Sequence, residues 1–204
     1  QLITYVLDQA HYLDIEIGDD FSEKVFYSFL ENIDPYKRFL YQSDIDILSK
    51  YKYEIDDSFN QPNLEFFNLA YEILIQRIDE SKQISQEVLS KPFDFQLEET
   101  FNFDIEELQY VNSRIDLVER WRKLMKVYLI ENYHDEIKED ERTFKKDSTF
   151  KLRSYSKIEI ETREILNETM ADYFVIMEEE FQRQHWFSIY LNSFVSQYDP
   201  NTSY

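Results

Sequence analysis

Glycine is nearly absent from this chain, and its scarcity constrains the fold more than any other feature. The 204 residues contain one glycine and four prolines, whereas Phe, Trp and Tyr make up 17%. An all-β fold depends on tight turns whose positive φ angles favour glycine. The chain is therefore predicted to be all-α, a multi-helix bundle that can be elongated, and its length suits a single domain over residues 1–204.

Two similar octets each end an amphipathic stretch. Residues 28–35 read SFLENIDP, and residues 193–200 read SFVSQYDP. In both octets apolar side chains recur on one helical face before an Asp-Pro pair. The residue before proline is disfavoured in the α region, and proline has no N–H to donate. Each pair therefore predicts the end of a helix.

Helical periodicity extends over most of the chain. The stretch at 20–33 begins with a predicted capping pair, Asp20 and Glu23, and Ser43 with Asp46 repeats this start signal. The predicted helices cover residues 2–13, 20–33, 43–60, 62–90 and 113–133, with the last helices over about 158–198.

Two segments depart from this periodicity. Around residues 92–104 apolar and polar residues alternate, which predicts a short extended or β-like insert. Residues 134–157 run from an acidic block into a basic block, which predicts a solvated loop or a frayed helix end.

Charge and composition exclude several functions. The formal net charge of −20 disfavours nucleic acid and anionic membrane surfaces as partners. Cysteine is absent, which excludes a disulfide scaffold and zinc–sulfur sites. No stretch approaches the roughly 20 apolar residues of a membrane span, so membrane insertion is not expected.

Several motifs, taken in order, resemble the N-terminal helical region of the tail-specific or C-terminal processing peptidases, serine proteases of the bacterial cell envelope. The first Asp-Pro octet corresponds to the end of the family's opening helix, and the second leads into its Asp-Pro-x-Thr-Ser-Tyr ending. The other matching segments are FSEKVF at 21–26, FLYQSDI at 39–45, KPFDF at 91–95, FNFD at 101–104 and ERWRK at 119–123.

The resemblance implies that the chain is a fragment of a longer protease. In the family this region leads into a PDZ domain, and then into a core with a Ser-Lys catalytic pair. The resemblance thus implies a non-catalytic domain of the periplasm or cell envelope, with no cofactor. Such a domain would help form the vessel around the catalytic site, or dock substrate or an adaptor. Its partners would be protein substrates, an adaptor, and its own PDZ and protease domains.

Two alternatives come from other functional classes. The first is a stand-alone acidic helical module that binds a partner protein. The second is a metal-binding helical bundle built around Glu131 and His134, whose spacing places them on one helix face. A bundle site needs a second such motif, and His11 and His185 lack a glutamate three residues before them. A surface pair is therefore favoured, and no metal ligand is predicted.

No catalytic residue is predicted within the chain. Serine and lysine occur close together at 22–24 and 154–157, but on charged segments where the lysines should stay protonated. Three aromatic residues near the C-terminal end are candidates for packing on a following domain. These residues are Phe187, Tyr198 and Tyr204, and the alternative is an ordinary last helix.

Overall fold

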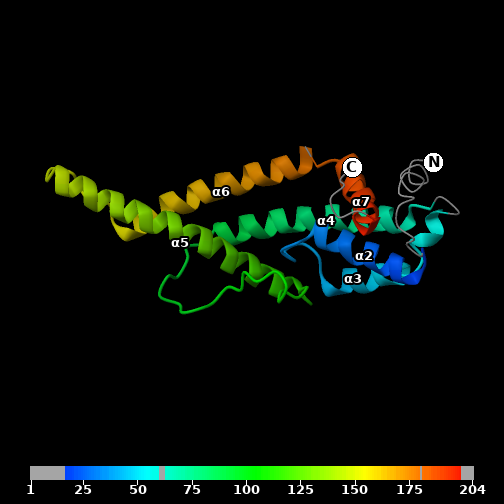
Figure 1. Cartoon of the computed structure of the whole chain (residues 1–204). Helices are drawn as coiled ribbons and strands as arrows, with labels where there is room; N and C mark the ends of the chain where they lie inside the picture. The colour runs from blue at the N-terminus through cyan, green and yellow to red at the C-terminus, as the bar shows by residue number, and fades with distance from the viewer. Residues whose placement is uncertain (1–16, 60–62, 180, 199–204) are drawn as a thin grey trace. The chain divides into compact units, whose positions relative to one another are not determined.

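The computed structural model (Figure 1) describes residues 17–59, 63–179 and 181–198. It contains six α-helices and no strand within those residues, which confirms the predicted all-α fold. The predicted helix at 2–13 lies outside the described residues. The α-helices are α2 (Asp19–Ile33), α3 (Gln42–Leu48), α4 (Glu65–Leu89), α5 (Arg114–Lys146), α6 (Tyr155–Glu179) and α7 (Arg183–Tyr198).

The chain divides into two compact units. Unit 1 comprises residues 1–78, 109–112 and 177–204, and unit 2 comprises residues 79–108 and 113–176. Helix α4 contributes its first part to unit 1 and its last part to unit 2. None of the described helices is both long and apolar enough to cross a membrane.

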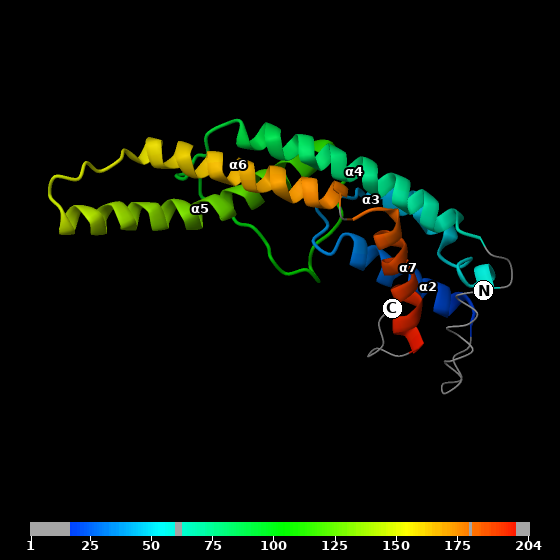
Figure 2. The ribbon, with the colours of Figure 1, turned by 90° about the horizontal axis from the view of Figure 1, so that it is seen from above.

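Unit 1 is built around aromatic side chains. Helix α2 buries an apolar stripe at helical spacing, and α7 lies against it (Figure 2). The ring of Tyr190 on α7 is 5.2 Å from that of Phe29 and 5.5 Å from that of Phe67, measured between centroids. All three side chains are at most 2% exposed, so they form the centre of this core.

The start of α2 differs from the prediction. The helix begins at Asp19, and its N-cap is Gly18, which makes no side-chain hydrogen bond. The predicted Asp20–Glu23 capping pair is therefore wrong. Asp19 and Asp20 instead lie in the first turn, where carboxylates interact favourably with the helix dipole.

The predicted helix at 43–60 is too long and starts too late. Helix α3 starts at Gln42, and the Asp44 carboxylate accepts the N–H of Tyr41 at 3.0 Å, so Ser43 and Asp46 are not the cap. After Leu48 the chain tightens into two 3₁₀ helices, η1 (Ser49–Tyr51) and η2 (Asp56–Phe59). Tertiary bonding explains this change, because the N–H of Asp56 donates to the buried Ser22 hydroxyl at 2.9 Å.

Unit 2 contains the last part of α4 together with α5 and α6. The Trp121 ring on α5 is fully buried and lies 5.8 Å from the Phe174 ring on α6. Arg163 on α6 donates to the carbonyl of Leu89 at the end of α4, at 2.8 Å. Apolar packing and this end-of-helix hydrogen bond together hold the three helices.

The segment between α4 and α5 is not helical, has turns at 95–96 and 105–107, and contains no strand. Ion pairs hold it to α5, because Glu99 bonds to both Arg122 and Lys126. Lys126 also donates to the carbonyl of Leu97 at 3.0 Å. Hydrogen bonds to side chains therefore replace the strand pairing that a β-like insert would need. In unit 1, Tyr41 and Val111 form an isolated bridge.

Helix α5 continues to Lys146, so the prediction of a loop or frayed end over 134–157 is wrong for residues 134–146. The order of the charge blocks favours this extension, since Lys145 and Lys146 occupy the last turn, where cations interact favourably with the helix dipole. Residues 147–154 form the predicted loop, and α6 begins at Tyr155 rather than near residue 158 (Figure 2).

Candidate functional site

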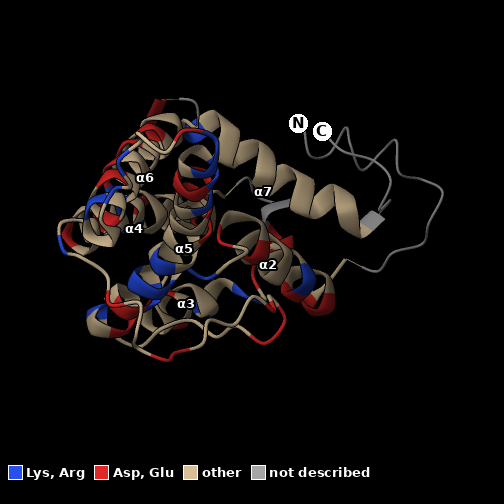
Figure 3. Ribbon diagram, turned by 90° about the vertical axis from the view of Figure 1, so that its left-hand side faces the viewer, with Lys and Arg blue, Asp and Glu red and all other residues tan. Residues whose placement is uncertain are grey.

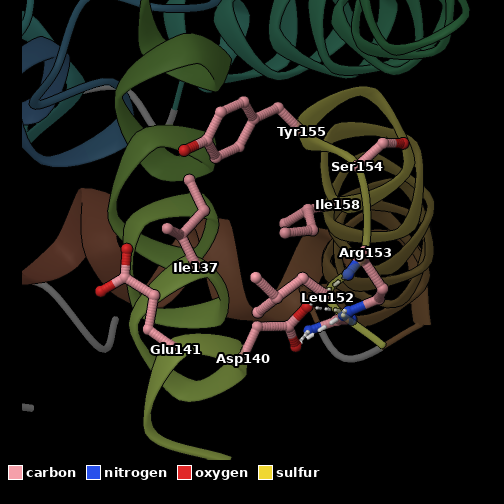
Figure 4. Close-up of a pocket in the computed structure, with 8 residues that line it drawn as sticks. All are labelled: Ile137, Asp140, Glu141, Leu152, Arg153, Ser154, Tyr155 and Ile158. Carbon is pink, nitrogen blue, oxygen red and sulfur yellow. Dashed lines mark hydrogen bonds and ion pairs between the residues drawn. The ribbon is translucent and has the colours of Figure 1, made fainter. Parts of the chain in front are cut away.

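A cavity of about 270 Å³ lies in unit 2, between the last turns of α5 and the beginning of α6. Ile137 projects into it from α5, and Ile158 from α6 (Figure 4). Leu152 and Tyr155 form two further walls and are exposed, at 51% and 66%. The cavity is therefore apolar inside and open to solvent through side chains that a partner could contact.

An ion-pair cluster braces one wall of the cavity. The Arg153 guanidinium pairs with Asp140 at 2.6 Å, with Glu161 at 2.7 Å and with Glu136 at 2.8 Å. The backbone N–H of Arg153 also donates to the Asp140 carboxylate at 2.9 Å. The cluster thus ties the loop before α6 to both helices.

Asp140 is the central anion of this cluster. Asp140 is 5% exposed, and the hydrogen bonds of its carboxylate with the Arg153 side chain and backbone lower its pKa. A buried carboxylate without a partner would be costly, so Asp140 needs Arg153 to remain ionised. By contrast, the carboxylate of Glu141 points away from the cavity (Figure 4).

No motif in the sequence predicted this site. Ile137 lies within a charged stretch, and Leu152 and Tyr155 lie in and beside a loop. One signal was available, because Ile130, Ile137 and Phe144 recur every seven residues and place an apolar stripe on one side of a continuous helix.

The first Asp-Pro pair has a structural role in unit 1. Asp34 is 1% exposed, and its carboxylate accepts the backbone N–H groups of Arg38, Phe39 and Leu40 at 2.9, 3.1 and 2.9 Å. Burial raises the pKa of Asp34, while these three donors oppose the rise. The turn also places Lys37 at φ 47°, in the left-handed region. Asp34 therefore organises the chain after α2, in addition to the steric effect of Pro35. The second pair, Asp199-Pro200, lies outside the described residues.

The three aromatic candidates for inter-domain contact stay predictions. Phe187 is half-buried within unit 1, where its ring packs edge-on against Phe67 at 5.1 Å. Tyr198 is the last residue of α7, but its side chain lies outside the described residues, as does the whole of Tyr204.

The Glu131–His134 pair lies on the exposed surface of α5. Within the described part of the chain, no group of three or more His, Cys, Asp or Glu side chains is placed to hold a metal ion. The structure therefore gives no support there to the metal-binding alternative.

Ser22, one of several buried serines, and the buried Lys126 are each bonded to a carboxylate. The Ser22 hydroxyl donates to the Asp56 carboxylate at 2.5 Å. Lys126 is the one buried lysine among the described residues, and its ammonium pairs with Glu99 at 2.6 Å. A lysine that serves as a general base must reach its serine, whereas the Lys126 ammonium is bonded to the Glu99 carboxylate and to the carbonyl of Leu97.

Comparisons with known proteins agree with the resemblance read from the motifs. The family model described as the tail specific protease N-terminal domain matches residues 3–204. The chain is 30% identical over 199 residues to the tail-specific protease of Haemophilus influenzae, which covers 97% of the chain and 26% of that protein. The chain thus spans about a quarter of the length of this relative. The chain belongs to the tail specific protease N-terminal domain family.

Proposed function

We propose that this chain is the non-catalytic N-terminal helical domain of a cell-envelope tail-specific serine endopeptidase, and that it docks protein substrates or an adaptor. The observation that carries the docking role is the apolar cavity between α5 and α6, whose walls Leu152 and Tyr155 remain exposed. Exposed apolar side chains around a concave site are typical of surfaces that bind a partner.

The partners of Ser22 and Lys126 support the non-catalytic role. Lys126 is paired with Glu99, and the Ser22 hydroxyl is bound to Asp56. Neither group therefore resembles an activated nucleophile or its base. The acyl-transfer chemistry of the parent protein would belong to a Ser-Lys pair outside this chain.

The family assignment extends the proposal to the whole protein. The parent would act in the periplasm or cell envelope and cleave protein substrates near their C-termini, with a PDZ module recognising the tail. The helical domain would help form the vessel around the catalytic site. No cofactor is needed for this role.

A competition experiment tests the docking role. The 204-residue chain is added in excess to the full-length protease while cleavage of an unfolded protein with an apolar C-terminus is followed. The chain alone should cleave nothing, and its addition should raise the apparent KM by sequestering substrate or adaptor. An unchanged rate would contradict the docking role, and serine-dependent cleavage by the chain alone would contradict the non-catalytic role.

Two matched variants locate the docking surface. Leu152→Glu places a charge at the cavity, whereas Leu97→Glu makes the same change at a leucine of equal exposure, 52% against 51%. The Leu152→Glu chain should no longer compete with the full-length protease, whereas the Leu97→Glu chain should still compete. Circular dichroism should show the same helical content for both. A stand-alone binding module would bind partners through the same surface without affecting the cleavage rate.

A further inference from the structure

The end of the α5–α6 hairpin differs in charge from the rest of the chain. Residues 142–157, which we call the basic tip, contain six cations and one acid, a net charge of +5. Because the whole chain carries −20, the remaining residues carry −25. An average over the chain therefore conceals a basic region on an acidic protein. The cations are Arg142, Lys145, Lys146, Lys151, Arg153 and Lys157.

Most of these cations are available to a partner. Lys145, Lys146 and Lys151 are exposed, and no ion pair within the described residues involves them. Arg142 and Lys157 make only long pairs, at 3.5 and 3.6 Å, with side chains 66% and 61% exposed. Such exposed pairs hold a side chain weakly. Among the six cations, Arg153 is the one held in close ion pairs, because it braces the cavity wall.

The cavity adjoins these cations in the sequence and in space. Lys151 precedes the wall residue Leu152, and Lys157 precedes Ile158. At about 270 Å³ the cavity is smaller than the roughly 300–1,000 Å³ of typical small-molecule sites. A cavity of this size and lining suits a single apolar side chain of a partner rather than a free ligand.

We propose that the basic tip and the cavity together bind an extended acidic segment of a partner protein, which places one apolar side chain in the cavity. This inference rests on the proposed docking function and names the chemistry that the site recognises. The cations would attract the acidic flanks, while Ile137, Leu152 and Ile158 would contact the apolar anchor.

The same observations favour a protein segment over an anionic membrane. A lipid surface would attract the lysines, but it has no single side chain to occupy the cavity. The net charge of −25 on the remaining residues would also oppose binding to an anionic surface. A short segment would touch only the tip and the cavity, where the acids Glu136, Asp140 and Glu161 are already paired with Arg153. Repulsion from more distant acids is screened over about 8 Å at physiological salt.

Peptide binding by the 204-residue chain tests the proposal. The probe is a fluorescein-labelled peptide of about ten residues, with a central leucine flanked by Asp, Glu and Ser, and binding is followed by anisotropy. The triple variant Lys145→Glu, Lys146→Glu, Lys151→Glu should bind at least about tenfold more weakly at low salt. A peptide with serine in place of its leucine should also bind the unmodified chain about tenfold more weakly.

The matched control reverses the charge of three exposed lysines outside the tip. Lys24→Glu, Lys50→Glu, Lys91→Glu makes the same change in net charge and should weaken binding less than about threefold. Equal weakening by both triple variants would overturn the proposal, because only net charge would then matter. Equal binding of the leucine and serine peptides would overturn the role of the cavity.

Further outcomes separate this proposal from the docking function itself. Binding to phosphatidylglycerol-containing vesicles without binding to the peptide would assign the tip to a lipid surface and overturn the proposal. If the peptide fails to bind but the chain still competes with the full-length protease, the docking function stands and only this recognition chemistry falls.

Discussion

Buried apolar side chains hold helix α7 of unit 1 in place, whereas ion pairs hold the last turns of α5 in unit 2. Helix α7 carries a single charged residue, Arg183, and it buries Trp186, Tyr190, Leu191, Phe194 and Val195. Residues 134–146 of α5 have one buried side chain, and it is the carboxylate of Asp140. Figure 3 shows the contrast, because α7 is almost free of charged residues and α5 is not.

The difference indicates how each region should respond to perturbation. Stabilisation by buried aromatic area depends little on pH, whereas stabilisation by ion pairs depends on the protonation of each carboxylate. Regions with few buried apolar contacts also open locally at lower free energy, and binding surfaces are often of this kind. The α5–α6 tip therefore combines the features of an adaptable binding surface, and α7 those of a scaffold.

The largest effect is expected from removing an aromatic ring of α7. Tyr190→Ala should lower the free energy of unfolding by about 3–5 kcal/mol, because Tyr190 is 2% exposed and its ring contacts Phe29, Phe67 and Phe194. Urea unfolding followed by circular dichroism measures the loss. The control Tyr36→Ala, at a residue 51% exposed, should cost less than about 1 kcal/mol. Similar losses for both would contradict the assignment of α7 as a scaffold.

An intermediate and local effect is expected from breaking the ion-pair cluster. Arg153→Ala leaves the buried Asp140 without its cation and should reduce the stability of the tip by about 2 kcal/mol. Hydrogen exchange should show faster exchange at residues 134–158, while the amides of α7 keep their protection. Arg142→Ala, which removes an exposed pair at 3.5 Å, is the matched control and should change little. Unchanged exchange in the Arg153 variant would show that the cluster does not brace the tip.

The smallest effect is a pH dependence at Glu99. Hydrogen bonds and charge from Arg122, and then from Lys126, lower the pKa of Glu99 to about 2. A depressed folded-state pKa gives stability that is present above the unfolded value of about 4.3 and is lost as the pH falls toward 2. When the pH is lowered from about 5 to about 2, the free energy of unfolding of the unmodified chain should fall by about 1–2 kcal/mol more than that of Glu99→Gln. Urea titrations at several pH values measure this, and parallel curves would rule out a strong pair.

Local chemistry accounts for the parts of the fold that were predicted correctly. The Asp34-Pro35 end of α2 and the interruption of the helices at Pro92 follow from steric rules that act over a few residues. Two of the mistakes occurred where distant residues compete with local preference. The predicted helix at 43–60 is interrupted because Asp56 bonds to Ser22, 34 residues away. The helix at 134–146 was missed because its stabilising cation, Arg153, lies beyond the helix itself.

The sequence by itself determined the all-α class, the first Asp-Pro helix end and the family, because all three depend on composition and on short ordered motifs. Only the tertiary structure decided where a cavity forms. The cavity exists because the packing of α5 and α6 brings Ile137 and Ile158 to the same space. In the sequence Asp140 resembles a solubilising surface acid, whereas in the fold it is buried. It can be buried because the loop before α6 brings the Arg153 guanidinium to its carboxylate.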